Sequence, residues 1–248
     1  MYNEIDMNLK LLRGKPIEIE MVGKVYPITL NDIVDITIEK YYQFLSLLCV
    51  DKISIQKLLN IDDEIGVFEF IYINCIKNDE YKNLILEALE YFLREKIGLC
   101  DYGFYVGSIE NDKIINEQIF EEIVKIIKLQ NCLVSKVEKE KYKPVNERAR
   151  KILEKLKKDQ LTREKIKQRQ ANEDGESLDL FDLVSILSAY GNNINIFNIW
   201  DLTFFQFNNQ FNRMKILKDC ETNIQILMHT TEPDKVEYQH WLSKIENE

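Results

Sequence analysis

Residues 197–214 read FNIWDLTFFQFNNQFNRM, and the spacing of their apolar side chains indicates how this chain folds. Large apolar residues recur there at steps of three and four, at Phe197, Trp200, Phe204, Phe207, Phe211 and Met214. Side chains at these steps share one side of an α-helix, so the stretch predicts a helix with a continuous apolar face. Each aromatic ring can bury roughly 150–250 Å², so this face needs a large apolar counter-surface.

The polar positions of the same stretch carry amides instead of charges, at Asn198, Gln206, Asn208, Asn209, Gln210 and Asn212. A solvated helix elsewhere in this chain carries Lys and Glu, as residues 145–170 do. Two interpretations stay open. The apolar face either packs in a helical core against a helix predicted over 177–190, or it is presented to a partner. Both interpretations hold if one face of the helix packs within the protein while the adjacent face binds a partner.

The rest of the chain is also predicted to be mainly helical, with one or two short β-hairpins near the N-terminus. Only 4 Pro and 8 Gly interrupt it, which favours helices over a turn-rich β fold. One hairpin is expected over 16–28, with its turn at Gly23-Lys24, and a second over 104–115. Helices are expected over 32–50, 53–59, 65–76, 79–96, from Asn116 onward, over 177–190 and over 221–229. Gly98 is expected to be the C-cap of the helix over 79–96. The helix over 177–190 is expected to turn Leu180, Phe181, Val184 and Leu187 inward.

The distribution of charge divides the chain into three parts. The net charge is −9, yet residues 136–169 hold 14 Lys and Arg against 6 Asp and Glu, so the remainder carries −17. We therefore expect an N-terminal domain of a hairpin and helices over 1–135. A basic linker helix with a flexible end follows over 136–176, and a small, aromatic-rich helical domain over 177–248.

Motifs that would identify an enzyme, a metal centre or a cofactor site do not occur in the sequence. It holds 2 His and lacks HExxH, Cys-x-x-Cys, P-loop, Gly-x-Gly-x-x-Gly and Gly-x-Ser-x-Gly patterns. We therefore expect no catalytic, cofactor-binding or metal-binding residue and no enzymatic activity. The five cysteines are expected to be small buried hydrophobic residues, at positions Cys49, Cys75, Cys100, Cys132 and Cys220.

The basic segment 136–169 is the best sequence evidence for nucleic-acid binding, but its composition disfavours that role. Acidic residues interleave with the basic ones, and Tyr142 is the one aromatic available to stack on a base. A solvated spacer, or an electrostatic contact with an acidic partner or with the acidic remainder of this chain, fits better. The first residues, Met-Tyr-Asn-Glu-Ile-Asp, carry acid where a signal peptide needs a basic region, so we expect none, and no apolar run approaches the roughly 20 residues of a membrane helix. The expected location is the cytoplasm, with no membrane contact.

Four C-terminal stretches together resemble a known group of proteins. They are LDLFDLVSIL over 178–187, NNINIFNIWD over 192–201, TFFQFNNQFNR over 203–213 and WLSKI over 241–245. This pattern resembles small cytoplasmic proteins from the tail modules of phages and prophages of low-GC Gram-positive bacteria, some of which are tail assembly chaperones. The resemblance is clearest over about the last 75 residues.

The resemblance implies a non-enzymatic role in the host cell cytoplasm. Such chaperones bind the tape-measure protein, keep that long helical chain soluble, and help tail tube subunits to polymerise around it without remaining in the mature tail. The partner-binding residues would then be the six of the apolar face, Phe197, Trp200, Phe204, Phe207, Phe211 and Met214. Two alternatives remain: a permanent component of a phage tail or baseplate, and a nucleic-acid-binding regulator that uses the basic helix. The oligomeric state does not follow from the sequence.

Overall fold

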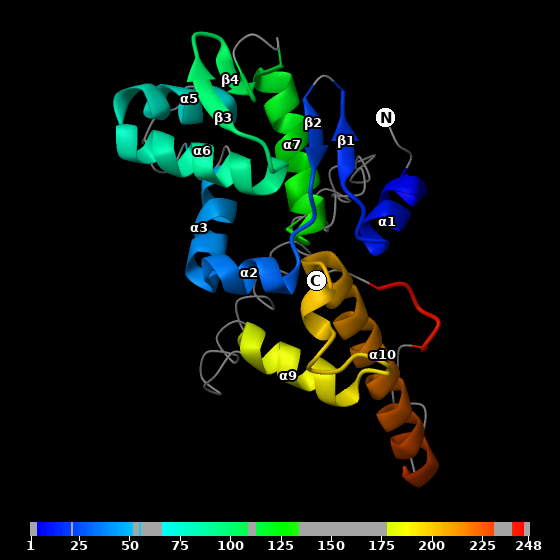
Figure 1. The fold of residues 1–248 in the computed structure, drawn as a ribbon. Helices are drawn as coiled ribbons and strands as arrows, with labels where there is room; N and C mark the ends of the chain where they lie inside the picture. Colours follow the sequence, from blue (N-terminus) through cyan, green and yellow to red (C-terminus); the bar gives the residue numbers. More distant parts are fainter. Residues whose placement is uncertain are drawn as a thin grey trace, which may run out of the picture.

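The computed structural model describes residues 4–20, 22–51, 55, 66–108, 113–133, 178–230 and 240–245. As predicted, the fold is mainly α, with two small antiparallel sheets in the N-terminal half (Figure 1). The elements are α1 (Glu4–Leu12), β1 (Ile17–Ile19), β2 (Gly23–Val25), α2 (Leu30–Ile36), α3 (Ile38–Leu48), α5 (Val67–Lys77), α6 (Asp79–Leu93), β3 (Ile97–Cys100), β4 (Gly103–Val106), β5 (Ile114–Ile115), α7 (Glu117–Gln130), α9 (Leu180–Tyr190), the 3-10 helix η2 (Ile199–Asp201) and α10 (Phe204–His229). The predicted linker helix over 136–176 lies outside the described residues, as does the predicted helix over 53–59 apart from Ile55.

The first hairpin forms where the sequence predicts it, but its turn lies earlier. Ile17 pairs with Val25 and Ile19 pairs with Gly23, so Gly23 and Lys24 belong to β2 and the turn precedes Gly23. The alternating pattern decides this register, because Ile17, Ile19 and Val25 are all buried on one face.

The single helix predicted over 32–50 is wrong, because the chain breaks it at Thr37. This residue has φ 78° and ψ 149°, which no α-helix contains. Thr37 ends α2, and its side-chain oxygen accepts a hydrogen bond from the backbone N–H of Lys40 at 3.4 Å, which caps α3. The break lets two short helices with separate buried faces replace one long helix.

Gly98 is not the C-cap predicted for α6. The helix ends at Leu93, and its C-cap is Arg94, which has φ 56° in the left-handed region. Gly98 lies in β3 opposite Tyr105 of β4. A Cβ atom at Gly98 would lie 2.1 Å from Cζ of the Tyr105 ring, so the glycine leaves room for that ring to lie across the strand.

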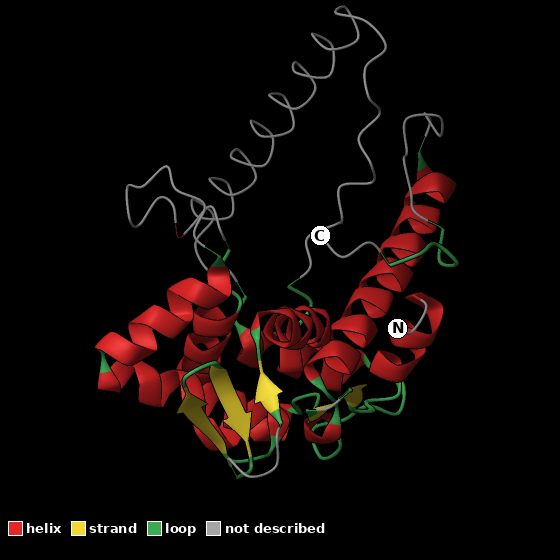
Figure 2. Ribbon diagram, turned by 90° about the horizontal axis from the view of Figure 1, so that it is seen from above, coloured by secondary structure: helices red, strands yellow, loops and turns green. Residues whose placement is uncertain are grey.

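Helix α7 is the centre of the fold. It contacts both sheets through β1, β2 and β5, and it also contacts α5 and α10 (Figure 1). The three-stranded sheet lies at the edge of the molecule with helices on one side of it (Figure 2). One hydrophobic cluster joins residues of all these elements, among them Phe104, Phe120 and Ile127.

The C-terminal elements belong to the same hydrophobic cluster as the N-terminal ones. Val184 and Leu187 of α9, Ile199 of η2 and Phe207 of α10 are all members of it. Helix α10 runs unbroken over 26 residues, so the separate helix predicted over 221–229 is instead its last part. That end of α10 extends beyond the other described elements (Figure 1).

Candidate protein-interaction surface

Helix α10 begins at Phe204, so the helix predicted from Phe197 is wrong over its first seven residues. A capping box at Thr203 sets this start. The backbone N–H of Gln206 donates to Oγ1 of Thr203 at 3.3 Å, and the backbone N–H of Thr203 donates to Oε1 of Gln206 at 2.9 Å. Before the box the chain forms η2, and Leu202 is extended.

Four of the six predicted partner-binding residues lie on α10 and pack against the protein itself. Phe207 is 2% exposed and belongs to the core, and Phe204, Phe211 and Met214 pack against it. The Phe207 ring lies 6.4 Å from that of Phe204 and 6.3 Å from that of Phe211, and the ring of Tyr41 in α3 lies 5.9 Å from that of Phe204. The counter-surface that this face requires is therefore supplied in part by N-terminal residues.

The other two predicted residues precede α10 and differ from each other. Trp200 is half-buried against the core, and its indole N–H donates to the backbone oxygen of Ile196 at 2.7 Å. Phe197 is 90% exposed. Among the six, Phe197 is therefore the residue that a partner reaches without any rearrangement.

Two of the amides between the aromatic residues, Gln206 and Asn208, make internal contacts. Nε2 of Gln206 donates to the backbone oxygen of Leu12 at 2.9 Å, which ties α10 to the end of α1. Asn208 forms a hydrogen bond with the thiol of Cys132, beyond the end of α7. Uncharged amides suit these half-buried positions, since a charged side chain there would lose its hydration.

Exposed apolar side chains are concentrated in the C-terminal elements. More than half of the large hydrophobic residues that are exposed in the described chain lie at or after residue 178, although this part is the shorter one. Up to the end of α10 they are Leu178, Phe181, Tyr190, Ile196, Phe197, Leu217, Ile224, Ile226 and Met228. The inward position predicted for Phe181 is wrong, because α9 is packed through Val184 and Leu187 and leaves Phe181 on its outer side, 78% exposed.

Three of these residues form a stripe on the projecting end of α10, here called the distal face: Leu217, Ile224 and Met228. Their steps of seven and four place them on one side of the helix. They are 38%, 41% and 75% exposed, whereas Ile216 and Cys220 on another side of the same helix are buried. This face is not among the residues predicted from the sequence, although the spacing of Leu217, Ile224 and Met228 indicates it.

The charge around the first part of this region is negative. Residues 178–212 contain Asp179, Asp182 and Asp201 and no Lys, Arg or His. Asp179 and Asp201 are exposed. An apolar surface with an acidic rim favours partners whose apolar face is flanked by basic residues.

The described residues provide little for metal or thiol chemistry. No His, Cys, Asp and Glu side chains among them gather in a group of three that could hold a metal ion. Burial raises the pKa of the Cys49 and Cys75 thiols to about 11, which keeps them protonated and unreactive at neutral pH. No helix in the described part combines the length and apolar composition that crossing a membrane requires.

A comparison with protein families found one match, over residues 167–246. The family is described as the YomV second domain, and it is phage-associated. The matched range includes α9, η2 and α10, which carry the exposed residues described above. Searches of curated proteins and of solved structures each returned no match.

Proposed function

We propose that this protein is a non-enzymatic phage tail assembly chaperone that binds a helical partner such as the tape-measure protein. One observation carries the proposal. The segment that matches a phage-associated domain is also the part of the described chain where large apolar side chains are most exposed. Exposed apolar patches mark protein interaction sites in soluble proteins, so this segment is the best candidate for partner contact.

The binding residues in this proposal are those that a partner can reach. Phe197 contacts the partner directly, together with Ile196 and the distal face of α10. The helical partner lays its apolar side along these residues, as amphipathic helices do in apolar grooves. The other five residues of the predicted set do not contact the partner in this proposal. They hold α10 and η2 in position against the core: Trp200, Phe204, Phe207, Phe211 and Met214.

The experiment is co-expression with the tape-measure protein of the same phage or prophage. The test variant replaces Phe197 and Met228 by Ser, since their high exposure makes the folded state insensitive to the change. We expect the wild-type chain to keep the tape-measure protein in the soluble fraction, and Phe197→Ser/Met228→Ser to lose most of that effect.

The matched control is Tyr102→Ser/Ile76→Ser, which removes two apolar side chains of similar exposure from the N-terminal part. It should rescue as the wild type does. Equal rescue by the test variant would contradict the proposal, and so would equal loss in the control. Mass spectrometry of purified virions separates the chaperone from a permanent tail or baseplate component, because a chaperone is depleted from mature particles.

A further inference from the structure

Helix α1 presents an apolar stripe to solvent. Ile5, Leu9 and Leu12 follow one another at steps of four and three, so they share one side of the helix. They are 71%, 59% and 44% exposed, while Leu11 on the inner side is 1% exposed. A stripe of this kind on a soluble protein is a surface for a partner.

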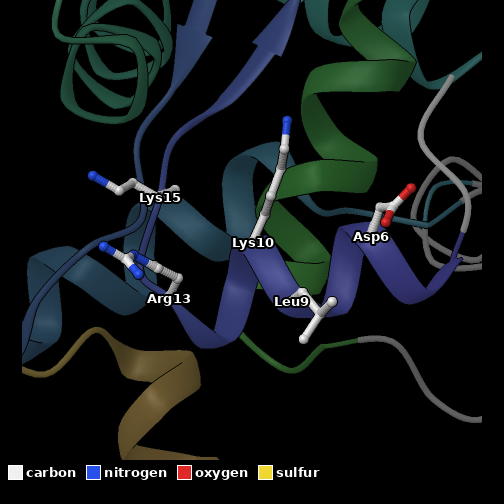
Figure 3. Close-up of a pocket in the computed structure, with 5 residues that line it drawn as sticks. All are labelled: Asp6, Leu9, Lys10, Arg13 and Lys15. Atoms are coloured by element: carbon white, nitrogen blue, oxygen red, sulfur yellow. The ribbon is translucent and has the colours of Figure 1, made fainter.

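A shallow basic hollow lies beside this stripe. Its volume is about 340 Å³, and it is lined by Asp6, Leu9, Lys10, Arg13 and Lys15. Arg13 and Lys15 are exposed, and their charged ends extend toward the same side in Figure 3. The lining has more positive than negative groups in a chain whose net charge is −9. Leu9 gives the hollow an apolar wall, so it suits a ligand with both an apolar and an acidic side chain.

The same chain carries a segment of that chemistry at the start of α9. Residues 178–182 read Leu-Asp-Leu-Phe-Asp. Leu178 and Phe181 are 58% and 78% exposed, and Asp179 beside them is exposed as well. Asp179 and Asp182 form the capping box of α9, which fixes both carboxylates at the start of the helix that carries Phe181.

We propose that the basic hollow beside α1 binds the start of α9 from a second copy of this chain. The Phe181 ring packs on the α1 stripe at Leu9, and the carboxylates of residues 179 and 182 face Arg13 and Lys15. The contact is not made within one molecule, because α1 and the first turn of α9 lie on opposite sides of α10 (Figure 1). This self-association is independent of the proposed partner binding.

The geometry makes the contact heterologous: a different surface is used on each copy. Such contacts repeat head to tail and give closed rings or open chains, depending on the rotation between copies. Two copies of net charge −9 repel at low ionic strength. The association is therefore best measured near 0.15 M salt, where the Debye length is about 8 Å and local complementarity outweighs the net charge.

Sedimentation velocity of the full chain over a concentration series is the test. We expect self-association of the wild type, weakened at least about tenfold (roughly 1.4 kcal/mol) by Arg13→Glu/Lys15→Glu and by Phe181→Ser. The matched controls are Lys125→Glu/Lys215→Glu, which makes the same charge change at exposed sites elsewhere, and Tyr102→Ser, which removes an aromatic residue that is 80% exposed. Both controls should associate as the wild type does.

Mixing gives the sharpest result. The Arg13→Glu/Lys15→Glu variant keeps an intact α9 start, and Phe181→Ser keeps an intact hollow. At concentrations where the wild type associates, each variant alone should be largely monomeric, whereas an equimolar mixture should form a 1:1 complex that grows no further, because one intact pair of surfaces remains. Circular dichroism checks that each variant is folded, and Leu9→Ser replaces the charge variant if that one is not.

A wild type that stays monomeric over the whole series would overturn the proposal. So would association that Phe181→Ser leaves unchanged, since the contact would then use another surface. A mixture that shows no complex would rule out the heterologous arrangement.

Discussion

Thr29 and Thr203 face each other in an isolated antiparallel bridge, and each is the N-cap of a helix that leaves the bridge, α2 and α10. The backbone N–H of Leu30 donates to the oxygen of Leu202, and the N–H of Phe204 donates to the oxygen of Ile28, both at 2.9 Å. Both caps are capping boxes, so each threonine satisfies its own helix while its backbone joins the two parts of the chain. The start of α10 is thereby anchored to the N-terminal half.

Gln206 should contribute more to stability than its exposure suggests. Its side chain accepts from the backbone of Thr203 and donates to the backbone of Leu12, so it joins the capping box to α1. We expect Gln206→Ala to lower the free energy of unfolding by about 1–2 kcal/mol, from the loss of two hydrogen bonds. Gln210→Ala, one turn further at an exposed position, is the control and should change it by less than about 0.5 kcal/mol. Urea denaturation measures both, and equal effects would contradict this role.

Thr37 stores backbone strain that glycine should release. A β-branched residue at φ 78° and ψ 149° occupies a region that is nearly exclusive to glycine and costs about 1–3 kcal/mol. Thr37→Gly removes that strain and loses only a few tenths of a kcal/mol as an N-cap, although it adds freedom to the unfolded chain. We expect a net gain of about 1 kcal/mol, seen as a higher melting temperature. Thr37→Ala keeps the strain and loses the cap, so it should be less stable than the wild type.

Gly103 and Gly23 both have positive φ, but their surroundings differ. A Cβ atom at Gly103 would lie 2.3 Å from the backbone oxygen of Ile115 in β5, whereas nothing lies within 4 Å of one at Gly23. Gly23→Ala should cost about 1–2 kcal/mol from the backbone conformation alone. Gly103→Ala should cost about 3 kcal/mol or more, because the strand pair must also separate. Thermal unfolding compares the two variants. Similar losses of stability would contradict this prediction and show that β5 moves away from Gly103 at little cost.

Stability should fall at alkaline pH, because buried thiols and phenols hold their protons. Burial raises the pKa of Cys49 and Cys75 from 9.0 to about 11, and that of Tyr81 from 10.0 to about 12. The unfolded chain loses these protons first, so the stabilisation is complete below about pH 9 and is lost as the pH rises through 11 to 12. Melting temperatures at pH 8, 9 and 10.5 test this. In Cys75→Ala the decline should be shallower, and a flat profile in the wild type would refute the prediction.

The sequence predicts those features whose cause is local. The cap at Asn116 is a side chain that accepts from the N–H of Ile119 at 3.0 Å, and its signal is contained in neighbouring residues. The strands of the first hairpin are predicted by the alternation of apolar and polar residues, and the structure buries their apolar positions. Thr37 gives only a weak signal of this kind, because threonine serves as an N-cap but also occurs inside helices, and the apolar pattern continues across it.

Other features depend on residues far along the chain. Gly98 has the sequence environment of a C-cap, and the ring of Tyr105 across the strand pair decides its position. The apolar face of α10 is visible in the sequence, but periodicity alone does not show which surface covers it. Tyr41 does so in part, although it lies far from Phe204 in the chain. For the same reason the sequence did not separate the exposed Phe197 from the buried Phe207.

Phe207 and Phe197 should therefore respond to truncation in opposite ways. Phe207 is 2% exposed inside the shared core, so Phe207→Ala should cost about 3–5 kcal/mol of stability. Phe197 is 90% exposed, so Phe197→Ala should change stability by less than about 0.5 kcal/mol. Urea denaturation measures the first effect, and soluble co-expression with the helical partner measures the second.

If Phe197 binds a partner, Phe197→Ala weakens the rescue while the protein remains as stable as the wild type. Phe207→Leu is the matched control for the core, since it keeps most of the apolar volume and should retain both stability and rescue better than Phe207→Ala. A large loss of stability in Phe197→Ala would mean that its ring packs within the protein in solution. If Phe197→Ala keeps full rescue, and Phe207→Ala loses rescue only because the protein unfolds, the whole apolar face belongs to the core and none of it binds the partner.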